Sequence, residues 1–390
     1  MMPGMKKILF FPLSNVLGHL TRTLALAEEF DAQGHEVYIA MHPTYSYVTK
    51  VLPPSIRILP TPEMYADTIQ SFGLIQHYPE TIANDRANLE SCWRIEESDL
   101  RRRRERMKLM VDRDTAIVEE VRPDAIITDY RFTTQLVQHR QRQRAFHISH
   151  VIGYLSFYRR VMGSDFFPLS SGHILVPGVR NIEYWKRSPT HPDSQRRETI
   201  CGYFRWAGWR RLHRDAPTPP PSNVFLFFGS TGNGRQIVPW FLQNIPERYR
   251  ISTIAPGMND GGARGGAYFS NSGELERFLN TTEVAFCHGG HGTVMECILH
   301  RTPMAIFPHN IEQLEIGRHI EKMRLGILVK RPYNQLNGED LGAIIEELKT
   351  NARIRSNLEK YSRVLRQLDG PKNAVSTVLQ SLANGSVPSS

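Results

Sequence analysis

The sequence is poor in cysteine and has no long apolar run. Its four cysteines, Cys92, Cys201, Cys287 and Cys297, show neither disulfide pairing nor metal-ligand spacing, which fits a reducing compartment. No stretch of about 18 apolar residues occurs, and the apolar run at residues 8–13 is too short for the core of a signal peptide. We therefore expect a soluble, cytoplasmic protein, and contact with a membrane surface stays open.

The chain also lacks a concentration of charge of one sign. Its net charge is +9, and the residues from 224 onward contain 18 Lys and Arg against 15 Asp and Glu, which leaves 30 against 24 before them. The run of four arginines at residues 101–104 has acidic neighbours, so ion pairs along a helix explain it, with a polyanion site as the alternative. Since no nucleic-acid-binding motif is visible, we expect no nucleic-acid partner.

The length and the proline distribution indicate two domains. A chain of 390 residues can form two domains of about 150–200 residues each, and a hydrophobic content of 40% can fill both cores. The stretch DAPTPPPSN at residues 215–223 is the clearest linker because it is stiff and polar. We expect an N-terminal domain over residues 1–215, a linker over 216–223 and a C-terminal domain over 224–390.

A glycine-rich turn stands at the centre of the C-terminal domain. Residues 284–307 predict a strand, the turn HGGHGT, a helix and a second strand, which is one βαβ unit of a parallel sheet. Glycines let a ligand approach the backbone, and the helix start offers N–H groups to an anion. His288 and Thr293 can add hydrogen-bond donors, and Glu296 can accept hydrogen bonds from vicinal hydroxyls. Such a site suits a nucleoside diphosphate.

The start of the chain repeats this pattern, because residues 6–41 predict a strand, a turn, a helix and a second strand. His19 lies at the carboxyl end of the first strand, where open α/β sheets bind ligands, and an imidazole there can take a proton from a hydroxyl near pH 7. Asp129 ends a later strand at residues 124–129 and can partner a cationic His19. The alternatives are a capping or phosphate-contacting role for His19 and a helix-capping role for Asp129.

The C-terminal turn resembles the sugar-donor motif of inverting GT-B glycosyltransferases, the family that includes plant secondary-metabolite UDP-sugar transferases and bacterial antibiotic glycosyltransferases. The matching positions follow the family's spacing without a gap: His288, Gly290, Gly292, Thr293, Glu296, Pro303, Pro308, Glu312 and Gln313. The resemblance implies that His288 and Thr293 contact the diphosphate and Glu296 the ribose. It implies that Glu312 and Gln313 contact the sugar hydroxyls. An ordinary βα turn with a capping threonine is the alternative interpretation.

The resemblance also implies the fold, the reaction and further site residues. The fold is the GT-B fold, two Rossmann-like α/β domains facing across a cleft, in which the last helix often packs back on the N-terminal domain. The reaction is inverting transfer of a sugar from a UDP-sugar, or alternatively a TDP-sugar, to a hydroxyl of a small apolar or aromatic natural product. His19 is the implied general base and Asp129 its partner, and Ser230 and Thr231 are candidates that face the sugar donor. We expect no metal or other cofactor, because the helix dipole and hydrogen-bond donors stabilise the diphosphate.

Two departures from the family pattern leave the substrates open. Leu20-Thr21-Arg22 follows His19 where the family usually has Asn-Pro, and such a start also occurs in transferases for lipid-linked or cell-envelope acceptors. Residues 268–272 stand where the family has Pro-Gln near the nucleotide base, so the base is not defined. The alternative functions are a transferase for a lipid-linked or cell-envelope acceptor, a sugar-nucleotide epimerase, and a non-catalytic protein that binds sugar nucleotides. The oligomeric state is open.

Overall fold

The structure, a computed structural model, shows two compact units. It describes residues 4–14, 17–61, 97–129, 131, 137, 144–149, 173–179, 198–215, 218–229, 233–254, 267–270, 275–309 and 311–384. Unit 1 comprises Met1–Phe72, Trp93–Gly208 and Leu368–Ser390, and unit 2 comprises Gly73–Cys92 and Trp209–Gln367. Each unit is built on one parallel sheet.

Unit 1 has a seven-stranded sheet in the order β3-β2-β1-β4-β5-β6-β7, and all of its described strand pairs are parallel. The strands are β1 (Lys7–Pro12), β2 (Glu36–Met41), β3 (Arg57–Pro60), β4 (Ala125–Asp129), β5 (Ala145–Ile148), β6 (His173–Val176) and β7 (Glu198–Ile200). The helices are α1 (Leu17–Ala32), the 3₁₀ helix η1 (Pro43–Val51), α4 (Glu97–Val121) and α14 (Gly370–Ala383). Strands in the middle of a parallel sheet are covered on both faces, which explains why β1 is an almost uniformly apolar run.

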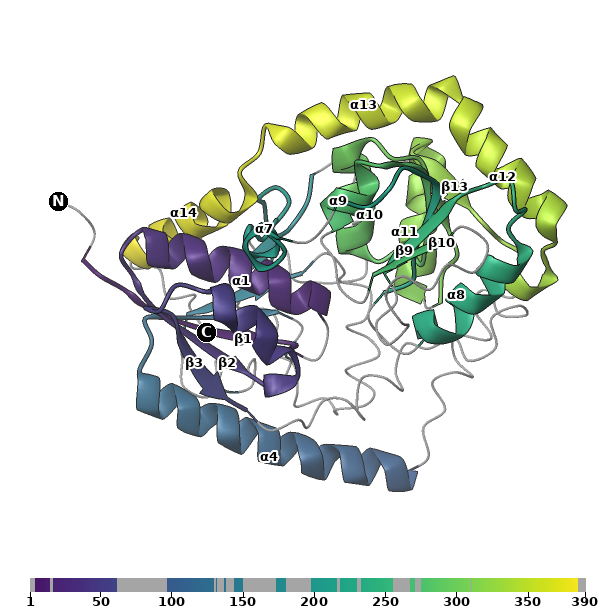
Figure 1. Ribbon diagram of the computed structural model, residues 1–390. Coiled ribbons are helices and arrows are strands. Elements are labelled where there is room, and N and C mark those ends of the chain that lie inside the picture. Colours follow the sequence, from purple (N-terminus) through teal and green to yellow (C-terminus); the bar gives the residue numbers. More distant parts are fainter. Residues whose placement is uncertain are drawn as a thin grey trace. The chain divides into compact units, whose positions relative to one another are not determined.

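Alternate residues of β1 point to opposite faces of its sheet. Leu9 and Phe11 pack with Val118 and its neighbours on α4. Phe10 points the other way and meets Phe30 of α1, with the ring centroids 5.9 Å apart. Figure 1 accordingly shows α4 on one side of β1–β3 and α1 with α14 on the other.

Unit 2 has a six-stranded sheet in the order β10-β9-β8-β11-β12-β13, again with parallel pairs. The strands are β8 (Ser222–Phe227), β9 (Ile251–Ile254), β10 (Ala267–Ser270), β11 (Thr282–Cys287), β12 (Met304–Ile306) and β13 (Gly326–Leu328). The helices are α7 (Gly208–Leu212), α8 (Asn233–Asn244), α9 (Leu275–Leu279), α10 (His291–His300), α11 (Ile311–Met323), η4 (Tyr333–Gln335), α12 (Gly338–Thr350) and α13 (Ala352–Arg366). Both units therefore confirm the predicted Rossmann-like folds, including the βαβ units at each glycine or histidine turn.

The boundaries of the units differ from the expected domain boundaries. The division after Gly208 places residues 209–215 in unit 2, where Arg210 donates to both carboxylate oxygens of Glu276 at 2.8 Å. β8 begins at Ser222, so the last two residues of the segment expected as a linker belong to a strand. The last helix, α14, belongs to unit 1 and packs on α1, as the family resemblance implied. These assignments depend on long-range contacts, which the composition of a linker does not reveal.

The strand order of each sheet creates a place for a ligand. β1 lies between β2 and β4, and β8 lies between β9 and β11, so the chain changes direction across the sheet at β1 and at β8. Open α/β sheets bind ligands at the carboxyl ends of strands at such a switch point. His19 follows β1 beside the end of β4, and His288 follows β11 beside the end of β8.

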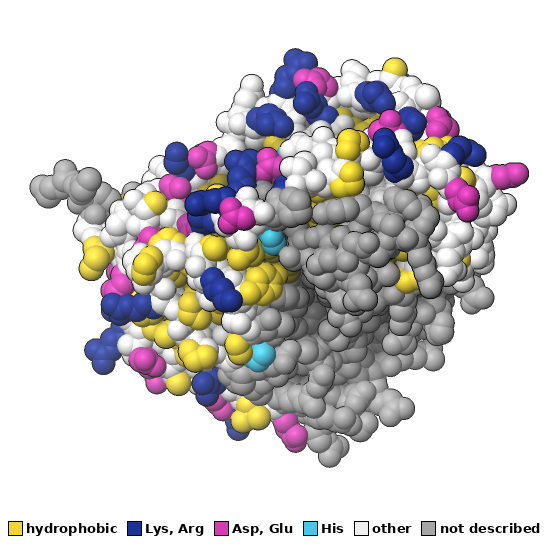
Figure 2. Space-filling view, in the orientation of Figure 1, with side chains coloured by type: hydrophobic (Ala, Val, Ile, Leu, Met, Phe, Trp, Pro, Cys, Tyr) yellow, Lys and Arg dark blue, Asp and Glu magenta, His cyan; other side chains and the backbone are white. Residues whose placement is uncertain are grey.

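The surface carries mixed charge. On the face drawn in Figure 2, basic and acidic side chains of the described residues are interspersed. Ion pairs at the surface, such as Arg301–Glu359 at 3.0 Å and the half-buried Lys349 with Glu283 at 3.1 Å, show the same mixing in unit 2. Within the part of the chain that the structure describes, no helix is both long and apolar enough to cross a membrane.

Candidate active site

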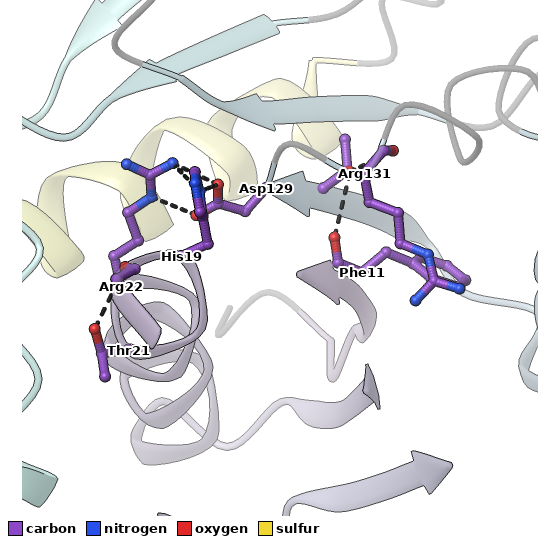
Figure 3. A network of polar contacts seen from close by, with 8 residues as sticks. Phe11, His19, Thr21, Arg22, Asp129 and Arg131 are labelled. Carbon is purple, nitrogen blue, oxygen red and sulfur yellow. Dashed lines mark hydrogen bonds and ion pairs between the residues drawn. The ribbon is translucent and has the colours of Figure 1, made fainter. Parts of the chain in front are cut away.

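The first candidate site lies at the switch point of unit 1. β1 and β4 pair in parallel, with Pro12 opposite Asp129, so Asp129 lies next to the turn that leads into α1. His19 occupies the first turn of α1, and its Nδ1 lies 2.7 Å from Oδ1 of Asp129 (Figure 3). Asp129 is 1% exposed. The structure thus brings together the two residues that the sequence analysis selected as base and partner.

Arg22 is a third member of this cluster that sequence reasoning did not select. It lies one turn after His19 on α1 and is buried. Its guanidinium donates two hydrogen bonds to Asp129, from Nε to Oδ2 and from Nη2 to Oδ1, the latter at 2.5 Å (Figure 3). The same Nη2 lies 2.6 Å from Nδ1 of His19. The spacing of three residues between His19 and Arg22 was the available signal, because such residues share a helix face.

The environment keeps the Asp129 carboxyl ionised. Burial alone would raise its pKa, because an apolar interior disfavours the charged form. The positive charge of Arg22, and then the interaction with His19, outweigh burial and lower the pKa of Asp129 below its ordinary value. Asp129 is therefore a carboxylate that accepts hydrogen bonds from Arg22 and can accept one from His19 when Nδ1 carries a proton.

A second buried ion pair holds the chain just after β4. Arg131 donates from Nε to Asp114 of α4 at 3.2 Å, also bonds it through Nη2, and stacks over the ring of Phe11 at 5.1 Å. Thr128 donates to the carbonyl of Arg131 at 3.0 Å. Because these contacts fix both sides of Asp129, we assign them a structural role at the end of β4.

The second candidate site, in unit 2, is the turn between β11 and α10. Gly289 has a left-handed φ of 84°, and a β-carbon there would lie 2.7 Å from Cγ2 of Ile306. A β-carbon on Gly290 would lie 2.5 Å from Nε2 of His288, so the imidazole lies directly over this glycine. His288 also lies edge-on to the ring of Phe227, at 6.3 Å between centroids. The two glycines therefore allow a tight turn, and the absence of a side chain at Gly290 lets the His288 ring pack against the backbone.

The start of α10 can bind an anion. Gly290 is its N-cap, and Gly292 and Thr293 belong to its first turn. The first N–H groups of a helix have no partner within the helix, and the helix dipole adds partial positive charge at this end. The Thr293 hydroxyl belongs to the same turn. The residues predicted for the diphosphate therefore gather at one helix start.

Glu296, the residue predicted for the ribose, is buried on α10. Its Oε2 lies 3.4 Å from Nε2 of His300, four residues further along the helix. Nδ1 of His300 in turn lies 2.9 Å from Oδ1 of Asn280. Sequence reasoning missed His300, although the spacing of four residues indicates a shared helix face. No local signal pointed to Asn280.

Of the other residues predicted for the sugar donor, Glu312 and Gln313 belong to α11. Gln313 lies in the first turn of α11, where its Oε1 accepts a hydrogen bond from the backbone N–H of His309 at 2.7 Å. Glu312 belongs to the same turn. Burial, and next the charge of His288, lower the pKa of His309 to about 3, so this imidazole is neutral at neutral pH. Ser230 and Thr231 lie outside the described residues.

The comparisons with known proteins differ in how much of the chain they match. No protein-family model matches the chain. The curated demethyllactenocin mycarosyltransferase of Streptomyces fradiae is 28% identical over 100 residues, which are 26% of this chain and 21% of that protein. The match thus spans about a fifth of the relative.

Solved structures match over nearly the whole chain. The spinosyn rhamnosyltransferase SpnG superposes with a TM-score of 0.70 at 15% identity, covering 96% of this chain and 100% of that one. The glycosyltransferase SnogD from Streptomyces nogalater superposes with a TM-score of 0.69 at 15% identity, covering 97% and 99%. The chain has the GT-B fold, as its sequence predicted. Its structural neighbours are bacterial natural-product glycosyltransferases.

Proposed function

We propose that this protein is an inverting glycosyltransferase that moves a sugar from a nucleoside-diphosphate sugar to a hydroxyl of a small acceptor. The observation that carries the proposal is the turn at residues 288–293, which joins a helix start, two close-approach glycines and His288 on a GT-B fold. Glu296 follows on the same helix, in the position that the family motif gives to the ribose contact.

In the proposed reaction the acceptor hydroxyl attacks the anomeric carbon of the sugar. Its proton passes to Nε2 of His19, while the bond from the anomeric carbon to the diphosphate oxygen breaks and its electron pair leaves with the diphosphate. Asp129 accepts the Nδ1–H of His19 and stabilises the imidazolium. Such a positioned base contributes a factor of about 10²–10⁴ to the rate. His288, Thr293 and the N–H groups of α10 stabilise the leaving diphosphate, so the proposal requires no metal.

The substrates are proposed by class. SpnG has been solved with thymidine diphosphate and with the spinosyn aglycone, which supports a nucleoside diphosphate and a small organic acceptor here. The family motif favours a UDP-sugar, and the SpnG complex favours a TDP-sugar. Glu312 and Gln313 are proposed to contact the sugar hydroxyls, and Ser230 and Thr231 the sugar donor. The proposed second substrate is a small apolar or aromatic molecule that offers a hydroxyl as the acceptor.

Calorimetric titration with UDP, TDP and GDP and their sugars, with and without a chelator, tests this function. We expect tight binding of one nucleoside diphosphate that the chelator does not change. Thr293→Val, which replaces the hydroxyl at nearly constant volume, should weaken it about tenfold. Thr350→Val is the matched control, since that hydroxyl bonds only the carbonyl of Glu346 within α12 among the contacts resolved there. Absence of binding by every nucleotide would refute the proposal.

His19→Gln tests the chemical step separately from binding. We expect the affinity for the nucleotide to stay within about twofold, since His19 and the α10 turn belong to different units. Slow hydrolysis or transfer of the bound sugar should fall by about 10²–10⁴. Full turnover in His19→Gln would remove the base assignment and leave the nucleotide site intact.

A further inference from the structure

The cluster around His19 contains an atom that has two incompatible partners. Nδ1 of His19 lies 2.7 Å from Oδ1 of Asp129 and 2.6 Å from Nη2 of Arg22. Nη2 of Arg22 is itself bonded to Oδ1 of Asp129 at 2.5 Å, so the three atoms form a triangle. Figure 3 shows the guanidinium and the imidazole turned toward the same carboxylate.

The chemistry of the three groups decides what each contact requires. A guanidinium keeps its charge at all relevant pH values and only donates hydrogen bonds, and a carboxylate only accepts them. Nδ1 can therefore bond Asp129 only when it carries a proton. It can accept from Arg22 only when it carries none. A neutral imidazole can satisfy one of these contacts and must oppose the other.

The two contacts select different tautomers of His19. When Nδ1 carries the proton and donates to Asp129, the lone pair is on Nε2, which can then accept a proton from a hydroxyl. When Nδ1 accepts from Arg22, the proton is on Nε2, and the ring cannot act as a base through that atom. The partner of Nδ1 thus decides whether His19 is competent as a base.

We propose that Arg22 is a positioning residue that competes with Asp129 for Nδ1 of His19 and so sets the tautomer of His19. Its bidentate bond to Asp129 fixes the carboxylate in place. Its Nη2 also stabilises the tautomer that is inactive as a base. Turnover by His19 then depends on the ratio of the tautomer bonded to Asp129 to the tautomer bonded to Arg22. A pair of histidine and aspartate alone has no second partner for Nδ1 and therefore no such competition.

The charge of the cluster supports this competition. Arg22 already neutralises Asp129, so the cluster is neutral while His19 is neutral and carries one positive charge when His19 is protonated. In a pair without an arginine the same two states carry charges of −1 and 0. The guanidinium therefore removes part of the attraction by which Asp129 alone would favour a proton on Nδ1.

Nitrogen NMR of the full chain, labelled with ¹⁵N-histidine, tests the proposal without a substrate, because long-range proton–nitrogen correlations distinguish the two tautomers. A spectrum of His19→Gln assigns the His19 signals by difference. We expect wild-type His19 at neutral or slightly basic pH to show both tautomers. In Arg22→Met the ratio of the Nε2–H to the Nδ1–H form should fall by about tenfold, the effect of about one net hydrogen bond.

Arg22→Lys keeps the charge beside Asp129 and removes the planar fork, so it serves if Arg22→Met does not fold. We expect it to lower the Nε2–H fraction in the same direction. Wild-type His19 wholly in the Nδ1–H form would overturn the proposal. So would a tautomer ratio that is unchanged in both variants. The link to turnover rests on the proposed function, but the tautomer ratio does not, so failure of nucleotide binding and failure of this competition are distinguishable.

Discussion

Gly290→Ala should displace His288 without straining the backbone. Gly290 has φ −61° and ψ 138°, an extended conformation that any residue adopts. Its new β-carbon would lie 2.5 Å from Nε2 of His288 and 3.1 Å from Cε1, so the imidazole has to move. Gly289 differs, because its φ of 84° is left-handed and its β-carbon would meet Cγ2 of Ile306 at 2.7 Å. Gly289→Ala should therefore strain the fold itself.

The two neighbouring substitutions separate binding from stability. A hydrogen bond from His288 to a charged diphosphate contributes about 1.5–3 kcal/mol, which corresponds to a loss of about 10- to 150-fold in affinity for Gly290→Ala. Its free energy of unfolding should change by less than about 1 kcal/mol, because alanine also restricts the unfolded chain. In Gly289→Ala the left-handed backbone costs about 1–2 kcal/mol, and the contact with Ile306 adds to that cost.

Calorimetric titration with the tightest-binding nucleoside diphosphate, together with urea unfolding, measures both effects. Gly18→Ala is the control, because its β-carbon would have no atom within 4 Å and it belongs to unit 1. Wild-type affinity in Gly290→Ala would refute the role of His288. Equal loss of stability in Gly289→Ala and Gly290→Ala would refute the geometric reasoning.

Three further predictions concern the buried carboxylates. Asp129→Asn should lower the free energy of unfolding by about 3–5 kcal/mol, because buried Arg22 loses its carboxylate; an unchanged urea midpoint would contradict this. Folding lowers the pKa of Asp129, so the stability that this carboxylate contributes is complete above its unfolded pKa of about 3.9 and is lost as the pH falls through its folded pKa. Between about pH 5 and 2 the free energy of unfolding of wild type should therefore depend on pH more steeply than that of Asp129→Asn. His300→Ala should reduce the binding preference for UDP over 2′-deoxy-UDP by about 2- to 10-fold, because Glu296 loses the imidazole that orients it. Asn280→Leu should act in the same direction, because Asn280 contacts that imidazole. An unchanged preference in both variants would show that His300 does not act on the ribose contact.

Local sequence patterns were enough to predict the two βαβ units. The run at residues 7–12 is apolar because β1 is covered on both faces, and the pattern of 284–307 shows strand, turn and helix within one stretch. Gly290 and Gly292 could be selected for the same reason, since a glycine-rich turn between a strand and a helix is a local pattern. The role of Gly289 could not, because the atom that its β-carbon would meet belongs to Ile306 of β12. The return of α14 to unit 1 was implied by the family resemblance rather than by local patterns. The boundary after Gly208 could not be predicted, because it depends on long-range contacts such as that between Arg210 and Glu276.

By itself the sequence determined the parallel α/β architecture, the glycine-rich turn that resembles a sugar-donor motif, and the placement of His19 after the first strand and of Asp129 at a strand end. Each of these depends on neighbours within one element or on the spacing of a motif. Only the tertiary structure decided that β1 and β4 are adjacent, which brings His19 to 2.7 Å from Asp129 across 110 residues of chain. It also decided that Arg22 shares this carboxylate. Such contacts depend on strand order and burial. These bring together residues that are far apart along the chain, and the sequence around each residue does not show that the two are close in space.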